Sequence, residues 1–369
     1  MSKVSKNITF IFNHGRNRRI NEEKEFPKEH FYGYFNFLQI NKDTKLIENS
    51  EVENKFVLIS KLLRKLTKFP IYIGKIVNKK NKKIIDNSNI LFFSNQNLFY
   101  SAFPYIYINN SKNTRIVVFF MGYKNILKNK KKFNRIQKFF FTAVIKKIDN
   151  ILFLSKSEKD LFSKEFPKFS KKANFINFAV DSKYWSRTNN SKTIDKILFL
   201  GNDESRDYKI LINIVNRMPD KKFIIISNKI NQNQFTSNNF NLIKSDWKTN
   251  KLSDSELKEI MENVDISIIP IKDGTTQPSG QSVALQSMSM GIPVMINSFE
   301  GFWDNELLVH EKNIYLVEDN TINNWINEIK LLSNNKDLKN ILSINGRKTI
   351  EDKLNLENFF NDLSKIVNF

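Results

Sequence analysis

The chain has 369 residues, no cysteine and three histidines, and its 59 Lys and Arg against 38 Asp and Glu give a net charge of +21. Without cysteine there are no disulfides or thiolate metal sites, and three scattered histidines do not suit a zinc site, so we expect no metal and no other cofactor. The apolar content of 40% predicts a folded protein with room for two domains. Because the chain shows no run of 18 apolar residues and no signal-peptide pattern, we expect it in the cytoplasm, either soluble or peripheral at the inner face of the membrane.

The excess positive charge lies entirely in the first half of the chain. Residues 1–185 hold 37 Lys and Arg against 14 Asp and Glu, a net charge of +23, and the remaining residues hold 22 against 24, a net charge of −2. A bias from genome base composition would act on both halves alike. The distribution therefore predicts a basic face on the first domain, with a polyanion or an anionic membrane surface as its partner. Unselected solvated charge is the alternative.

The segment Asn7–Phe12 predicts a first strand, followed by a polar, basic loop at residues 13–19. A loop at the carboxyl end of a first strand is a ligand-facing position in an open α/β sheet. Gly15 permits a tight turn, His14 could be a hydrogen-bond partner or a base, and Arg16 could meet phosphate. A solvated basic turn is the alternative interpretation.

Residues 56–69 place apolar side chains at helical spacing opposite Lys61, Arg64, Lys65 and Lys68. Such a cationic amphipathic helix can lie on a membrane, or it can pack its apolar face on the sheet of its own domain, which is the commoner case. A second basic and aromatic face is predicted where Lys128–Lys132, Arg135, Lys138, Lys146 and Lys147 flank Phe139–Phe141. No RRM, KH or helix-turn-helix signature accompanies it, so we expect no nucleic-acid partner.

The second domain opens with a predicted strand, Lys196–Gly201, and a polar loop at residues 202–209. Arg206 and Lys209 are the cations of this loop. They could bind an anionic ligand, or they could be helix-start residues paired with Asp203 or Glu204.

Residues 265–297 predict a strand, loop, helix, strand unit, with the helix running from about Gly280 to Gly291. Ser279 is the expected N-cap, and the turn from Ser279 to Ser282 would present backbone N–H groups and hydroxyls at the carboxyl edge of a parallel sheet. This is a good anion site. An ordinary βαβ unit, in which the Ser-Gly pair only caps the helix, is the alternative.

The segment Gln286–Val294, Gln-Ser-Met-Ser-Met-Gly-Ile-Pro-Val, resembles the donor-binding signature of retaining GT-B glycosyltransferases of the family-four type (glycosyl transferases group 1). That signature has one Glu, seven residues and a second Glu before Ala-Met-Ala-x-Gly-x-Pro-Val. Here Pro278 stands at the first Glu and Gln286 at the second. Residues 148–162 and 174–185 are similar to further stretches of the same family.

The resemblance implies an α/β chain with the GT-B fold, two Rossmann-like domains facing a central cleft. We expect a basic N-terminal acceptor domain over residues 1–185, a linker at 186–194 and a nucleotide-sugar donor domain over 195–352. The helix within residues 353–369 is expected to cross back to the first domain.

The resemblance also implies a glycosyltransferase, of hexosyltransferase type, which moves a sugar from a nucleotide sugar to a glycan or lipid-linked acceptor. Retention of configuration and a role in cell-surface polysaccharide, lipopolysaccharide or glycolipid synthesis are further expectations. The catalytic residues it implies are Arg206 and Lys209. The donor-binding residues are Gly201, Pro278, Ser279, Gly280, Gln281, Ser282 and Gln286, with Gln286 on the ribose. The acceptor-side residues are His14, Gly15 and Arg16. Since both signature carboxylates are replaced, the alternative is a non-catalytic GT-B-like protein that binds a polyanion or a membrane surface.

Overall fold

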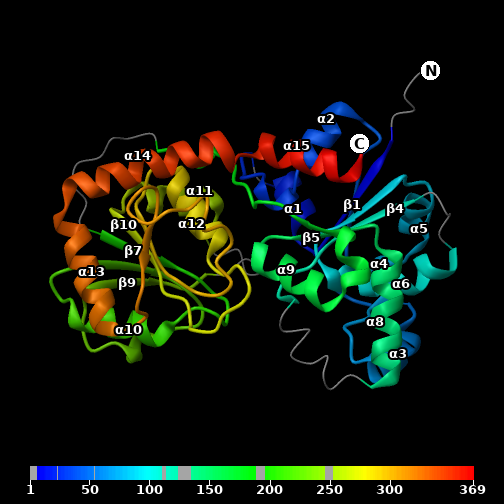
Figure 1. The fold of residues 1–369 in the computed structure, drawn as a ribbon, viewed down its shortest axis with the longest axis horizontal. Coiled ribbons are helices and arrows are strands. Elements are labelled where there is room, and N and C mark those ends of the chain that lie inside the picture. Colours follow the sequence, from blue (N-terminus) through cyan, green and yellow to red (C-terminus); the bar gives the residue numbers. More distant parts are fainter. Residues whose placement is uncertain are drawn as a thin grey trace. The chain divides into compact units, whose positions relative to one another are not determined.

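The computed structural model describes residues 6–22, 24–53, 55–109, 114–123, 134–187, 196–245 and 252–369. The chain divides into two compact units (Figure 1). The first unit comprises Met1–Lys24, His30–Ile176 and Phe359–Phe369, and the second comprises Glu25–Glu29 and Asn177–Asn358. Most of the expected linker at 186–194 and the basic run Lys128–Lys132 lie outside the described residues.

The first unit is built on a six-stranded parallel sheet in the order β2-β1-β3-β4-β5-β6. Its strands are β1 (Ile8–Phe12), β2 (Lys45–Glu48), β3 (Ile90–Phe93), β4 (Arg115–Phe119), β5 (Asn150–Phe153) and β6 (Ala173–Phe175). The inner strands are continuous apolar runs, which suits burial of both faces of a parallel sheet beneath helices.

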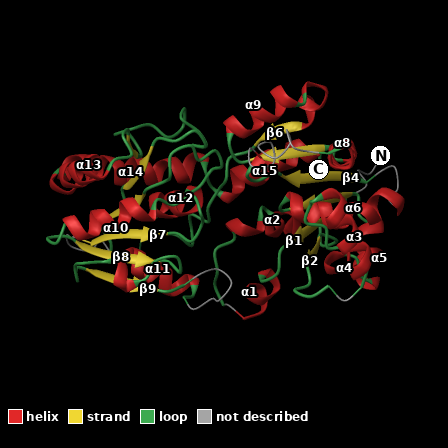
Figure 2. Ribbon diagram, turned by 90° about the horizontal axis from the view of Figure 1, so that it is seen from below, coloured by secondary structure: helices red, strands yellow, loops and turns green. Residues whose placement is uncertain are grey.

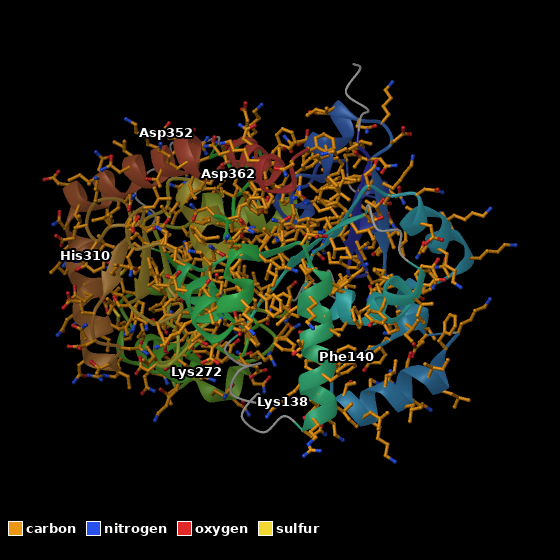
Figure 3. The ribbon with its side chains drawn as sticks, turned by 45° about the vertical axis from the view of Figure 1, so that its right-hand side comes forward. Lys138, Phe140, Lys272, His310, Asp352 and Asp362 are labelled. Atoms are coloured by element: carbon orange, nitrogen blue, oxygen red, sulfur yellow. The ribbon has the colours of Figure 1, made fainter. Side chains whose placement is uncertain are left out.

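The helices of the first unit connect these strands and cover the sheet. They are α1 (Arg16–Glu22), α2 (Tyr34–Ile40), α3 (Val57–Thr67), α4 (Ile73–Ile76), α5 (Lys79–Asp86), α6 (Gln96–Asn109), α8 (Arg135–Lys147), α9 (Lys156–Glu165) and, from Phe359 onward, α15 (Leu356–Val367), with 3-10 turns at Glu29–Phe31 and Pro167–Lys172. Helix α8 exposes Lys138 and buries Phe140 (Figure 3).

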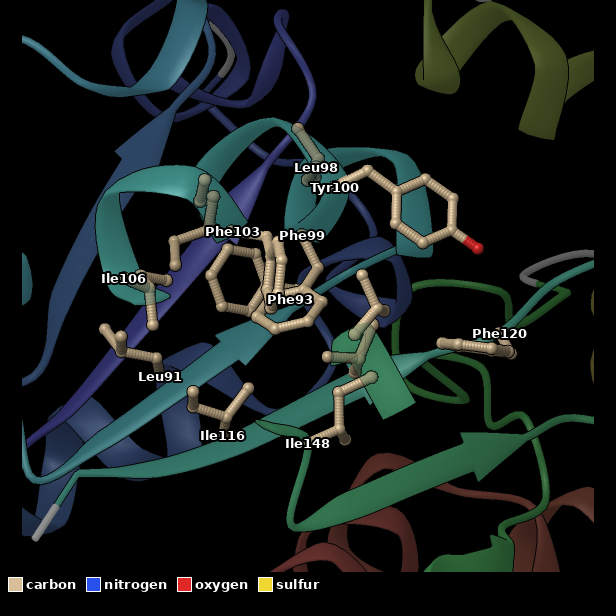
Figure 4. Close-up of a cluster of buried hydrophobic side chains, with 14 of the residues drawn as sticks. Leu91, Phe93, Leu98, Phe99, Tyr100, Phe103, Ile106, Ile116, Phe120 and Ile148 are labelled. Carbon is tan, nitrogen blue, oxygen red and sulfur yellow. The ribbon is translucent and has the colours of Figure 1, made fainter. Parts of the chain in front are cut away.

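An aromatic core fills the space between α6 and the sheet. Figure 4 shows Phe99 and Phe103 of α6 directed toward Phe93 of β3, with the ring centroids of Phe93 and Phe99 5.1 Å apart. At the opposite end of the chain, α15 packs on α2, where the rings of Phe37 and Phe360 meet at 4.8 Å. The carboxyl-terminal helix is therefore part of the first unit's packing.

The second unit repeats the plan with a six-stranded parallel sheet in the order β12-β11-β10-β7-β8-β9 (Figure 2). Its strands are β7 (Lys196–Leu200), β8 (Lys222–Ile226), β9 (Phe240–Ile243), β10 (Ile266–Ile269), β11 (Val294–Asn297) and β12 (Tyr315–Val317). Its helices are α10 (Tyr208–Arg217), α11 (Asp254–Glu262), α12 (Gln281–Ser289), α13 (Ile322–Asn334) and α14 (Lys336–Lys353), with a 3-10 turn at Gln232–Gln234. Both units are doubly wound.

Each sheet has a point where the strand order reverses, and this point positions the candidate site. In the second sheet β7 lies beside β10, so the loops after these two strands leave the same edge of the sheet next to each other. In the first sheet the corresponding pair is β1 and β3. Ligands of open α/β sheets bind at such points.

Helix α11 begins with a capping box, because the Ser253 Oγ accepts from the Glu256 backbone N–H at 3.2 Å and the Glu256 carboxylate accepts from Ser253 N. The interpretation of α3 as a helix that packs its apolar face on its own sheet is wrong, because the helix buries Ser60 and Thr67 and leaves most of its leucines exposed. No helix among the described residues has the length and apolarity needed to cross a membrane.

Candidate functional site

The loops that follow β7 and β10 are joined to each other by backbone hydrogen bonds. The N–H of Asp207 donates to the carbonyl of Pro270, and the N–H of Lys272 donates to the carbonyl of Ser205, both at 2.8 Å. Between these bonds, Arg206 and Ile271 form an antiparallel bridge. The pairing fixes the backbone of Arg206 at the reversal point of the second sheet.

The side chain of Arg206 is buried between two of the glycines predicted for the donor site. It is 3% exposed. A Cβ on Gly201 would lie 2.4 Å from its Nε, and a Cβ on Gly280 would lie 2.7 Å from its Nη1 and equally close to Ile269. Both positions therefore require glycine for the guanidinium to lie where it does, and Gly280 also has a φ of +84°.

The guanidinium of Arg206 is poorly satisfied by the protein. Its Nε lies 3.5 Å from an Asp203 carboxylate oxygen, and neither Nε nor Nη1 has a hydrogen-bond partner among the described residues. Burial lowers the pKa of Arg206, and the nearby Asp203 carboxylate offsets part of that effect. A buried cation with unmade hydrogen bonds is costly, and in a native protein it calls for an explanation such as the binding of an anionic ligand.

Helix α12 begins directly beside this guanidinium. The predicted N-cap, Ser279, is wrong by one residue: Gly280 is the N-cap, and it has no side chain to cap the helix. The Oγ of Ser279 instead accepts from the Gln277 side chain at 3.3 Å. The positive end of the α12 dipole and Arg206 therefore meet at Gly280, and both favour an anion.

The other predicted donor-site residues surround the same turn. Ser279 and Gln281 are buried, and Pro278 and Ser282 are half-buried. Lys209, in the first turn of α10, is exposed, and it takes no part in the backbone hydrogen bonds that pair the two loops.

Asn202 directly follows Gly201 at the end of β7. Its side-chain carbonyl accepts from the Asn228 N–H at 2.6 Å, and its amide donates to the Ser245 carbonyl at 2.8 Å. These bonds fasten the ends of β8 and β9 to the end of β7, a structural role that leaves Arg206 to supply the positive charge.

Gln286 bonds to a carboxylate that the sequence patterns did not indicate. Its Nε2 donates at 2.9 Å to Oε1 of Glu29, which also accepts from the Trp185 Nε1 at 2.8 Å. The other Glu29 oxygen accepts from the Asp181 N–H at 3.3 Å. Burial raises the pKa of Glu29 to about 7, against the lowering effect of its hydrogen bonds to Gln286 and Trp185.

In the first unit, the backbone N–H groups of the predicted loop His14–Arg16 bind a carboxylate of the chain itself, that of Glu48. Glu48 Oε1 accepts from the backbone N–H groups of Gly15 and Arg16, the second at 2.9 Å. Its Oε2 accepts from the Asn17 N–H at 3.1 Å. His14 is exposed, with Nδ1 3.2 Å from Glu51, and the Arg16 Nε donates to the His30 carbonyl at 3.2 Å. The N–H groups that could have met a phosphate are therefore already bonded.

The described residues contain no cluster of three or more His, Cys, Asp or Glu side chains placed to hold a metal ion. Arg206 is the buried cation at the reversal point of the second sheet, and Lys209 and Lys272 are exposed cations of the two loops that meet there.

Comparison with solved structures identifies the fold. No family model matches the sequence, and no curated protein matches it. Solved structures do match. A sucrose-phosphate synthase from Thermosynechococcus elongatus superposes with a TM-score of 0.70 at 12% identity, over 98% of each chain. A glycosyltransferase from Rickettsia africae ESF-5 gives 0.64 at 13% identity, over 98% of each chain, and Anabaena Alr3699/HepE, solved with UDP and glucose, gives 0.65 at 11% over 98% of this chain and 99% of that one. The chain therefore has the GT-B fold of glycosyltransferases, an α/β fold with two Rossmann-like units.

Proposed function

We propose that the protein is a glycosyltransferase that moves a sugar from a nucleoside diphosphate sugar to a glycan or lipid-linked acceptor. The observation that carries the proposal is the buried Arg206 guanidinium, with its unpartnered Nε and Nη1, at the uncapped start of α12. A diphosphate supplies the oxygens that these donors lack in the described residues. HepE, which has the same fold, is solved with UDP and glucose.

The chemistry follows from where charge develops during transfer. As the bond between the sugar and the diphosphate breaks, negative charge builds on the departing diphosphate. Fixed cations and dipoles at that position stabilise the transition state more than the ground state. Arg206 and the start of α12 provide this stabilisation. Lys209, exposed in the first turn of α10, is proposed as the second cation.

Further parts of the proposal are retention of anomeric configuration, a hexosyl donor, and an acceptor held by the basic first unit on the inner face of the membrane. They are supported by the resemblance of Gln286–Val294 to retaining family-four enzymes and by the excess charge of residues 1–185. Synthesis of a cell-surface polysaccharide, lipopolysaccharide or glycolipid fits such an acceptor. The anomeric configuration of an isolated product, read from its NMR coupling constants, tests the stereochemistry.

A second candidate, a non-catalytic GT-B-like protein, is favoured by one observation. The amide of Gln286, expected on the donor ribose, is bonded to Glu29, and Pro278 offers no carboxylate. Such a protein would bind a nucleotide or polyanion without turnover.

Titration calorimetry and turnover assays with UDP-, GDP-, CMP- and dTDP-sugars distinguish the two. Saturable binding of one nucleotide family, with release of that nucleotide, supports the transferase. Binding without release at any acceptor or enzyme concentration supports the second candidate. Failure of every sugar nucleotide and free nucleotide to bind contradicts both assignments of the Arg206 site.

A further inference from the structure

Helix α3 turns most of its apolar side chains away from the first unit. Its exposed apolar members are Leu58 (80%), Ile59 (51%), Leu62 (56%) and Leu66 (40%). On the inner side of the helix, Leu63 packs against the apolar core, Ser60 is buried and donates to the Glu53 carboxylate, and Thr67 donates to the Leu63 carbonyl at 2.7 Å. Leu58, Ile59, Leu62 and Leu66 are thus not used by the core of their own unit.

These four apolar side chains form one continuous stripe. At about 100° per residue, Leu58, Leu62, Leu66 and Ile59 fall in that order within an arc of about 100°. Lys61 and Lys65 are exposed along one border of the arc. Long lysine side chains beside such a stripe can keep their ammonium groups in water or among headgroups while the leucines lie deeper.

The neighbouring helix α8 continues this chemistry. The ring of Phe69, just after α3, stacks on Phe141 of α8 with centroids 5.8 Å apart, so the two helices pack together. Helix α8 leaves Phe139 75% exposed and Ile136 48% exposed, and Lys138 is also exposed. Beside Phe139 is a hollow of about 270 Å³, lined by Tyr107, Phe139, Thr142, Ala143, Lys146 and Lys147.

We propose that α3 lies in the interfacial layer of an anionic bilayer, with its leucine stripe at the acyl boundary and Lys61 and Lys65 among the headgroups. Single exposed leucines are ordinary, but a continuous apolar stripe bordered by lysines marks an interaction surface. The net charge of +23 over residues 1–185 selects an anionic partner and disfavours a second copy of the same face. A soluble polyanion would use the lysines and leave the leucines without a role.

The inference rests on the proposed function only for its purpose, which is to bring the first unit to a lipid-linked acceptor. It is tested by binding of the full chain to vesicles of phosphatidylcholine alone or mixed with phosphatidylglycerol, measured by sedimentation. The wild type is expected to bind the mixed vesicles. The double variant Leu58→Asp, Leu62→Asp is expected to lose at least about tenfold in partition coefficient, because each change replaces an exposed leucine with a charge.

Two further variants separate the contributions. Lys61→Gln with Lys65→Gln is expected to lose about tenfold on mixed vesicles and to weaken further with added salt. Ile344→Asp, on α14 of the second unit and 57% exposed in the wild type, is the matched control for Leu62 and is expected to bind like the wild type.

Equal vesicle binding by the wild type and the leucine variant overturns the proposal. So does loss of binding in the lysine variant alone, which would assign the face to a soluble polyanion. Donor binding at Arg206, measured without vesicles, is expected to be unchanged in every α3 variant. A failure at the donor site and a failure at the membrane face are therefore read from different assays.

Discussion

The Nε2 of Gln286 and the Oε1 of Glu29 are 2.9 Å apart in the buried interior of the second unit, although 257 residues separate them in the chain. Glu29 lies in the short segment Glu25–Glu29, which belongs to the second unit while the residues on both sides of it belong to the first. An amide at position 286 can donate a hydrogen bond to this carboxylate. A glutamate, which the related signature has at this position, would instead place two carboxylates against each other.

We therefore expect Gln286→Glu to lower the Tm at pH 8, because the two carboxylates would share one buried site and like charges at that distance repel strongly. At pH 5 the loss should be smaller, since one proton shared between the two groups removes the repulsion. Gln286→Met is the control, because it loses the hydrogen bond without adding charge, and its Tm change should be nearly independent of pH. A Gln286→Glu variant with wild-type Tm at pH 8 and tighter donor binding would instead assign residue 286 to the ribose.

Glu29 itself predicts a pH dependence of stability. Burial raises its pKa from 4.5 to about 7, so the folded protein binds more protons than the unfolded chain between these values. Stability from this group is fully present below about pH 4.5 and is lost as the pH rises toward 7, in total about 3 kcal/mol. The difference in unfolding free energy between the wild type and Glu29→Gln, from urea denaturation at several pH values, should fall over this interval. A difference that stays constant from pH 4.5 to 7.5 contradicts the assignment.

The sequence predicted the central strands and the long helices because their apolar residues recur at a clear period or form continuous runs. The strand expected at the start of residues 265–297 is β10 (Ile266–Ile269), and the helix expected within residues 353–369 is α15 (Leu356–Val367). The edge strands of both sheets, β2, β6, β9 and β12, were missed, because strands of three or four partly exposed residues leave no such pattern.

The residues of the candidate site were likewise predicted only in part. Gly201, Arg206 and Gly280 could be brought together from sequence, because they follow two strands that are neighbours in any doubly wound sheet of this order. Glu29 contacts Gln286 because the five-residue segment Glu25–Glu29 belongs to the second unit, although the residues on both sides of it belong to the first. No local sequence pattern predicts this. Glu48, which bonds the His14–Arg16 loop, was missed because it ends the unpredicted strand β2.

Replacing Arg206 should change stability and function in opposite directions, as expected for a buried cation that binds a ligand. In Arg206→Met a buried charge with unmade hydrogen bonds is replaced by an apolar chain of similar length, and the Asp203 side chain, 40% exposed in the wild type, can be solvated by water. We expect a Tm equal to or above that of the wild type, together with a loss of about a hundredfold in turnover or donor affinity. Arg217→Met, an exposed arginine on α10, is the control and should bind donor normally. Normal donor affinity in Arg206→Met would remove the main support for the proposed function.

Gly201→Ala tests whether the position of the guanidinium, rather than its presence, matters. The new methyl group would lie 2.4 Å from the Arg206 Nε and 2.9 Å from its Cγ, so the arginine must move while its charge is retained. We expect a loss of about 1–3 kcal/mol in stability from the crowding and at least a tenfold loss in donor affinity by titration calorimetry. Gly346→Ala, on α14, is the matched control, since its Cβ would meet no heavy atom closer than 3.3 Å and helices favour alanine over glycine. If Gly201→Ala binds donor as tightly as Gly346→Ala, the diphosphate is held by the start of α12 without help from Arg206, and the site needs reassignment to the backbone of residues 280–282.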